Sequence, residues 1–146
     1  MRRVEADRDL PASPDRVFAF VADLSNLPRW QTGIVSAEMT SPPPVGSGST
    51  AHVVRELMGQ RIAVDLAVTD FEPGRRLGLR SSASGIGIDA ELQLEAVAGD
   101  ASHVRFAMEI RAQNVFMKAV EGAVAGAAAA DLAASLDRLQ AALTET

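Results

Sequence analysis

The sequence predicts an α+β fold in which a curved antiparallel sheet of about seven strands wraps around a long C-terminal helix, with two short helices between the first and second strands. Three observations predict it. Residues 114–146 contain no proline and are rich in alanine and leucine, which are strong helix formers. Over about eighty preceding residues, apolar and polar side chains alternate as in half-buried strands. The connections between these strands are short, which favours antiparallel pairing of neighbours.

The C-terminal segment is expected to form one helix from about Val115 to about Leu143, on the order of 45 Å long. Asn114 is expected to cap its first turn. Glu121 lies near the middle of an apolar stripe whose C-terminal half is leucine and whose N-terminal half is alanine, glycine and valine. These small side chains either allow close packing or leave space for a pocket. The stripe consists of Met117, Val124, Ala128, Leu132, Leu136, Leu139 and Leu143.

The N-terminal part is expected to begin with a strand over residues 3–10, where apolar and charged side chains alternate. Ser13 then provides a helix N-cap, and Pro14 fits the first helical position. A helix is therefore expected from Pro14 to about Asp23, and residues 25–30 are expected to form a turn or a short second helix.

The middle of the chain is expected to form six strands, at residues 34–40, 49–57, 61–71, 76–80, 89–95 and 103–111. Turns with glycine or proline separate most of them, at 58–60, 72–75, 84–87 and 99–100. The sheet has one apolar face, and only the long C-terminal helix is large enough to cover it. A curved sheet on one helix also encloses volume, which favours a pocket between them.

Composition excludes several classes of function. The 146 residues fit one domain over 1–146. The net charge of -5 and the scattered basic residues argue against nucleic acid or an anionic membrane as the main partner. Without cysteine there is no disulfide, thiol nucleophile or thiolate metal site. The charged N-terminus and the absence of a long apolar stretch predict a cytoplasmic protein with no integral membrane association.

Three segments carry a family resemblance. Residues 10–23 are similar to the pattern "strand, A-x-P-x-x-V-W/F-x-x-x-x-D", residues 27–34 to "L-P-R-W-x-P-x-V", and residues 68–77 to "V-T-E-Y-E-P-P-x-R-L". Gly74 replaces the second proline of the last pattern, and residues 31–33 stand where a proline is often found. In this order the segments resemble the helix-grip fold of the START-like superfamily, the SRPBCC group. That group includes Bet v 1-like allergens, lipid-transfer START domains and bacterial polyketide cyclase/dehydrase-like proteins.

The resemblance implies a cavity between the sheet and the long helix that holds a small hydrophobic or lipid-like molecule. No cofactor and no metal are expected, because no ligand spacing typical of a metal site is present. The oligomeric state, monomer or homodimer, is left open by the sequence. The residues expected to line the cavity are Trp30, Leu77, Leu79, Leu92, Leu94, Phe106, Met108, Met117, Val120, Glu121, Val124 and Ala128.

Three functions compete. Binding or transport of a hydrophobic molecule is expected first, because no catalytic constellation is visible. The alternative is a cyclase/dehydratase-like enzyme acting in the same cavity, and a second alternative is a protein-interaction module on the same fold. A convergent polar cluster in the pocket would favour the enzymatic function. A closed, purely apolar cavity would favour binding or transport. A filled interior with a large exposed apolar patch would favour the interaction module.

Glu121 is the best single candidate for a catalytic or anchoring group. A carboxyl on an apolar stripe either pairs with a base from the sheet or has a raised pKa, unless it is solvated at the sheet edge. Trp30, the only tryptophan, is either a structural plug or a wall of the pocket. His52 and His103 are expected to be structural or solvated.

Overall fold

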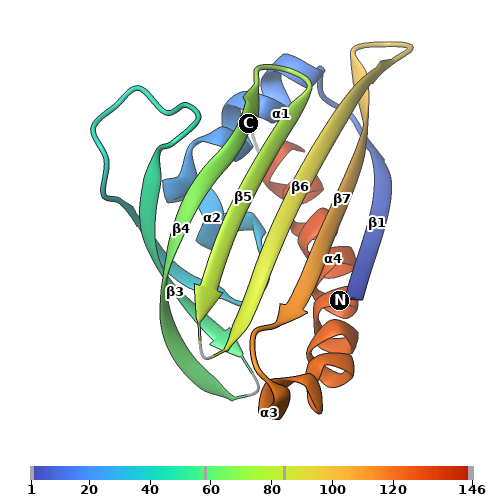
Figure 1. Cartoon of the computed structure of the whole chain (residues 1–146). Helices are drawn as coiled ribbons and strands as arrows, with labels where there is room; N and C mark the ends of the chain where they lie inside the picture. The colour runs from blue at the N-terminus through green and yellow to red at the C-terminus, as the bar shows by residue number, and fades with distance from the viewer. Residues whose placement is uncertain (1, 58, 84, 145–146) are drawn as a thin grey trace.

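The computed structural model describes residues 2–57, 59–83 and 85–144, and it shows a seven-stranded antiparallel sheet curved around one long helix (Figure 1). The strand order is β1-β7-β6-β5-β4-β3-β2. The predicted fold class is thereby confirmed. Positions 58 and 84, in two of the predicted turns, lie outside the described residues. The elements are β1 (Arg2–Leu10), α1 (Pro14–Ala22), η1 (Leu24–Asn26), α2 (Leu27–Trp30), β2 (Ile34–Met39), β3 (Thr50–Leu57), β4 (Gln60–Glu72), β5 (Arg76–Ala83), β6 (Ile86–Val97), β7 (Ala101–Ala112), α3 (Val115–Lys118) and α4 (Glu121–Thr144).

The first helix begins and ends where its capping residues predict. The hydroxyl of Ser13 accepts a hydrogen bond from the backbone N–H of Arg16 at 3.3 Å, and Pro14 occupies the first turn. After α1, the carboxylate of Asp23 caps the 3-10 helix η1 by accepting from the backbone N–H of Ser25. The short helix α2 follows directly, so the predicted pair of short connecting helices is confirmed as η1 and α2.

The prediction of one unbroken C-terminal helix is wrong. Asn114 caps the helix α3 as predicted, accepting from the N–H of Met117 at 2.8 Å, but α3 ends at Lys118 and α4 begins at Glu121. The Glu121 carboxylate accepts a hydrogen bond from the backbone N–H of Ala112, at the end of β7. The chain must therefore turn between the two helices to bring the start of α4 back to the sheet.

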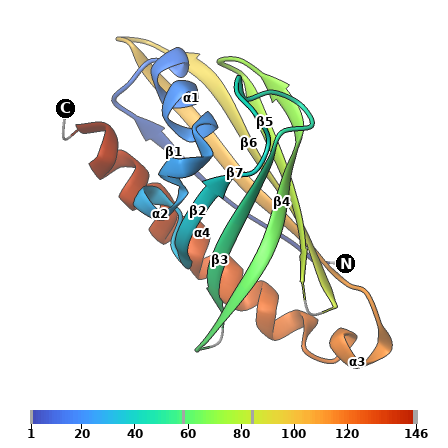
Figure 2. The same cartoon turned by 90° about the vertical axis from the view of Figure 1, so that its left-hand side faces the viewer.

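The core lies between the inner face of the sheet and α4 (Figure 2). Paired inward residues such as Leu92 and Phe106 are almost fully buried. Helix α4 packs mainly on β1, β7 and α2. The more distant strand β3 therefore faces α4 across the curve of the sheet. The apolar stripe of α4 is buried as predicted at Val124, Leu132, Leu136, Leu139 and Leu143.

Two large apolar side chains on α3 are strongly exposed: Val115 is 90% and Phe116 80% accessible. In the described part of the chain, no helix is both long and apolar enough to cross a membrane.

Strand β1 is fastened to β7 by a histidine held between two aspartates. Nδ1 of His103 lies 2.7 Å from Asp9, and its Nε2 lies 3.0 Å from Asp7. The hydrogen bond with Asp9 is the largest of the effects that raise the pKa of His103 above its ordinary 6.5, and the charges of both aspartates add to it. Glu95 occupies the position paired with His103 on β6, the other neighbouring strand.

The stability that His103 contributes is expected to depend on pH. Because its pKa is raised in the folded state, the contribution is complete below the unfolded pKa of about 6.5 and is lost as pH rises through the folded pKa. His103→Asn is therefore expected to lower Tm more at about pH 6 than at about pH 9. A thermal-melting series checks this, and the double variant Asp7→Asn/Asp9→Asn should remove the dependence. An equal Tm difference at both pH values would contradict the assignment.

Candidate functional site

A small pocket lies between the inner face of the sheet and α4. The space inside it that the centre of a water molecule can reach is about 10 Å³, which is room for about one water. A larger molecule can enter only if the walls move apart. The lining residues are Gln31 and Thr32 after α2, Arg55 on β3, Ile88 on β6, Met108 on β7, and Val124, Ala128, Asp131 and Ser135 on α4.

One wall of this pocket is polar. The hydroxyl of Ser135, which is buried, accepts a hydrogen bond from the backbone N–H of Thr32 at 2.9 Å and so joins α4 to the segment after α2. Within the described residues, Nε of Arg55 and Oγ1 of Thr32 are both buried without a hydrogen-bond partner. Buried polar atoms are nearly always paired, so two unpaired atoms in the wall of one pocket indicate a place for water or a polar ligand atom.

The pocket also contains one cation and one carboxylate. Burial lowers the pKa of the Arg55 guanidinium, and the negative charge of Asp131 partly opposes this. Burial raises the pKa of Asp131, and the positive charge of Arg55 partly opposes that. Among the ion pairs of the described chain, none joins these two side chains directly. The two groups therefore interact electrostatically without forming a direct ion pair, and Nε of Arg55 has no hydrogen-bond partner in the described part of the chain.

Local structure explains why these charges face inward. Arg55 follows Ala51 and Val53 at spacings of two on β3, and both of those residues are fully buried. Asp131 follows Ala128 by three residues on α4, so the two share one helix face. Arg55 and Asp131 are thus brought to the pocket by the strand and helix periods that build the core.

The structure brings only part of the predicted cavity lining into this pocket. Met108, Val124 and Ala128 line it. Met117 and Val120 are partly buried, beside the break between α3 and α4. Six predicted residues are buried in the core outside the pocket lining: Trp30, Leu77, Leu79, Leu92, Leu94 and Phe106.

Trp30 packs as a plug rather than as a pocket wall. Its side chain is 0% exposed, and its ring centroid lies 5.6 Å from that of Phe106. It does not line the pocket. The neighbouring Gln31 and Thr32 do, so this segment contributes to the site through polar residues that the sequence did not single out.

Glu121 is buried but lies outside the pocket lining. It is 6% exposed, accepts from the N–H of Ala112 at 2.9 Å, and lies 3.7 Å from Nε of Arg2. The hydrogen bond from Ala112 is the largest cause that lowers its pKa below the ordinary value, with contributions from nearby positive charges. The structure therefore shows neither the raised pKa nor the solvated carboxylate considered from the sequence. Glu121 fastens the start of α4 to the sheet.

The two histidines also lie outside the pocket. His52 is exposed on β3 and lies 3.2 Å from Asp65, and His103 clips β1 to β7. The described residues contain no cluster of histidine and acidic side chains suited to hold a metal ion.

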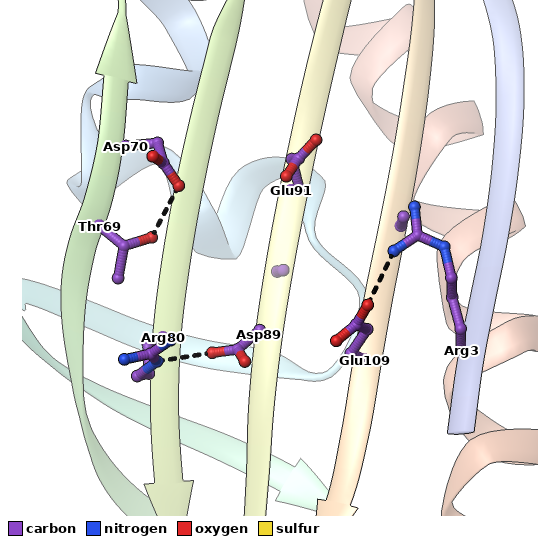
Figure 3. A pocket seen from close by; sticks show the side chains of 9 residues that line it. Arg3, Thr69, Asp70, Arg80, Asp89, Glu91 and Glu109 are labelled. Atoms are coloured by element: carbon purple, nitrogen blue, oxygen red, sulfur yellow. Dashed lines mark hydrogen bonds and ion pairs between the residues drawn. The ribbon is translucent and has the colours of Figure 1, made fainter. Parts of the chain in front are cut away.

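The outer face of the sheet carries an open polar groove across β4, β5, β6, β7 and β1 (Figure 3). Ion pairs cross it, including Arg80 with Asp89 at 2.7 Å and Arg3 with Glu109 at 3.2 Å. Such exposed pairs contribute little to stability and leave few polar atoms without partners. The groove is therefore a weaker site candidate than the pocket beneath α4.

Comparison with known proteins identifies the family. The curved sheet, the long helix and the pocket between them define a helix-grip protein. Residues 1–144 match the family described as "Polyketide cyclase / dehydrase and lipid transport", and the chain belongs to that family.

One relative and two solved structures are also similar to this chain. The chain is 35% identical over 95 residues to the uncharacterized protein Rv2574 of Mycobacterium tuberculosis, a match that spans 62% of this chain and 55% of that relative. A START superfamily protein from Mycobacterium smegmatis has a TM-score of 0.79 at 14% identity, covering 98% of this chain and 97% of that one. The Zhui aromatase/cyclase from Streptomyces sp. R1128 has a TM-score of 0.73 at 16% identity, covering 95% and 93%. At these identities the two structures show the fold alone.

Proposed function

We propose that the protein binds a small, largely apolar molecule carrying one oxygen-containing polar group in the pocket between the sheet and α4. The observation that carries this proposal is the pair of unpartnered buried atoms, Nε of Arg55 and Oγ1 of Thr32, in the wall of one pocket. Oxygen atoms of the ligand's polar group would satisfy them and lower the cost of their burial. Ile88, Met108 and Val124 supply the apolar remainder of the lining, as in most small-molecule sites.

Binding requires the pocket to open, because in this conformation it has room for about one water. The N-terminal half of α4 is suited to such a movement. Beyond the contact of Glu121 with the sheet at its start, its exposed face consists of small residues such as Ala123 and Ala127. The family description, which includes lipid transport, supports a ligand larger than water.

A second candidate function is acid–base chemistry on a carbonyl compound in the same pocket. Asp131 favours it, because burial raises the pKa of this carboxyl and the guanidinium of Arg55 lines the same pocket. Asp131 would exchange a proton with the substrate while Arg55 stabilises negative charge on the carbonyl oxygen. The similar fold of an aromatase/cyclase supports this candidate.

A protein-interaction role has less support. Val115 and Phe116 on α3 are the most exposed large apolar side chains in the described chain. Two adjacent side chains form only a small patch. The unpaired polar atoms lie in an internal pocket. A protein that binds to the outer surface would not provide them with a hydrogen-bond partner.

A matched pair of helix variants tests the proposed site. Ala128 lines the pocket, whereas its neighbour Ala127 is exposed. Ala128→Leu is expected to weaken binding of the apolar fluorescent probe N-phenyl-1-naphthylamine by about tenfold or more, because the added carbons fill the space. Ala127→Leu makes the same change on the outside and should leave binding unchanged. Fluorescence titration measures both, with circular dichroism to confirm folding. Equal binding by the two variants, or no binding by the parent protein, would contradict the proposal.

A further inference from the structure

We infer that the polar group of the ligand is an anion held by Arg55, and that its binding is coupled to the uptake of a proton by Asp131. This inference rests on the proposed ligand-binding function and names the chemistry of its ligand.

The first observation is that the guanidinium of Arg55 forms no direct ion pair with the carboxylate in the same pocket. Arginine stays protonated at all physiological pH values, so Arg55 brings a permanent positive charge into the pocket. Its Nε is buried with no hydrogen-bond partner within the part of the chain that the structure describes. Because no direct ion pair joins Arg55 to Asp131, this Nε–H remains available for another acceptor. A planar guanidinium with open donors is the side chain best suited to bind a carboxylate, sulfonate or phosphate.

The second step is the balance of charge around Arg55. Helix α4 contributes Asp131 and the uncharged Ser135, and the segment after α2 contributes the uncharged Gln31 and Thr32. From β6 and β7 the lining residues are apolar, Ile88 and Met108. The described pocket lining therefore holds one positive and one negative group.

An anionic ligand would place two negative charges beside one guanidinium in a partly buried site. Like charges at close range strongly favour protonation of one of them. When the ligand is a stronger acid than a carboxylic acid, as a sulfonate is, the ligand stays ionised and Asp131 takes the proton. Burial already raises the pKa of Asp131, which makes this protonation easier. The pocket then contains the same net charge before and after binding.

The coupling fixes the direction of the pH dependence. Below the pKa of Asp131 in the free protein, its carboxyl is already neutral and the anion binds most tightly. As pH rises from that pKa to the higher pKa of the complex, each bound anion brings in one proton, and affinity falls by up to about tenfold per pH unit. A neutral ligand of the same shape has no such dependence.

Two probes with the same ring system separate these cases. 8-Anilinonaphthalene-1-sulfonate carries a sulfonate that stays ionised, and N-phenyl-1-naphthylamine lacks it. Isothermal titration calorimetry in buffers of different ionisation enthalpy, from about pH 5 to about pH 8, counts the protons taken up. The sulfonate probe is expected to bind with uptake of up to about one proton and with affinity that falls as pH rises. The uncharged probe is expected to bind with none.

Variants assign the effect to its residues. Asp131→Asn should bind the sulfonate probe without proton uptake and with affinity independent of pH. Arg55→Gln should lose about tenfold or more in affinity for the sulfonate probe while it retains the uncharged one. The matched controls are Asp137→Asn on the same helix and Arg61→Gln on the neighbouring strand. Both lie outside the pocket lining and should behave like the parent protein.

The outcomes distinguish this inference from the proposed function. Failure of both probes to bind would overturn both. If the uncharged probe binds and Ala128→Leu blocks it, but the sulfonate probe binds without proton uptake, only the present inference is overturned. Proton uptake that persists in Asp131→Asn would also overturn it, because the proton would then go to another group.

Discussion

A chain that ends at Asn114 is expected not to fold. Helix α4 covers the inner face of β7, where Val104, Phe106, Met108 and Ile110 are almost completely buried. Each side chain of this size contributes about 1.5–3 kcal/mol when it is removed from water. Exposure of several of them costs about as much free energy as the whole stability of a typical domain, roughly 5–15 kcal/mol.

Circular dichroism and urea unfolding of residues 1–114 check this expectation. A matched pair in the full-length chain provides the control, since Leu132 is fully buried and its neighbour Ala133 is exposed. Leu132→Asp is expected to prevent folding, whereas Ala133→Asp should retain the native spectrum. A soluble 1–114 fragment that unfolds cooperatively would show that α4 is not an integral part of the fold.

The second large effect is expected at Trp30. Its ring is completely buried against Phe106, so Trp30→Ala leaves a large cavity and should destabilise the protein by about 3–5 kcal/mol. Trp30→Phe should cost clearly less, because a ring remains and the unpaired indole N–H is removed. Urea unfolding of the parent and both variants measures the difference in the free energy of unfolding.

Val97→Ala is a control for this series, because Val97 is partly exposed at the end of β6. Its cost should be small. A loss below about 1 kcal/mol for Trp30→Ala would mean that the site relaxes around the missing ring, and Trp30 would not be a plug.

The fold could be predicted because its elements follow periodic patterns with recognisable ends. The alternation of apolar and polar residues predicts the strand β7, and Ser13 predicts the start of α1. Both elements are present in the structure. The break between α3 and α4 could not be predicted in this way. Ala119 and Val120 are not helix breakers, and the turn depends on the contact of Glu121 with Ala112, which forms only when β7 and α4 come together.

The candidate site was predicted less well than the fold. The apolar wall was found at Met108, Val124 and Ala128, because pocket and core use the same inward face. The polar wall was not predicted. Arg55 could have been assigned to it, because alternate residues of β3 face inward and Arg55 follows Val53 by two positions. Asp131 likewise falls on the face of α4 that carries Ala128. That these two residues approach each other across the sheet depends on its curvature, which the strand pattern does not specify.

Nuclear Overhauser effects between N-phenyl-1-naphthylamine and methyl-labelled protein test most directly whether the internal pocket is the binding site. The expected result is a set of contacts from the probe's aromatic protons to the methyl groups of Ile88, Met108 and Val124, all of which line the pocket beneath α4. Contacts to Ala107 instead, in the groove on the outer face of the sheet, would contradict the assignment and move the site to that face.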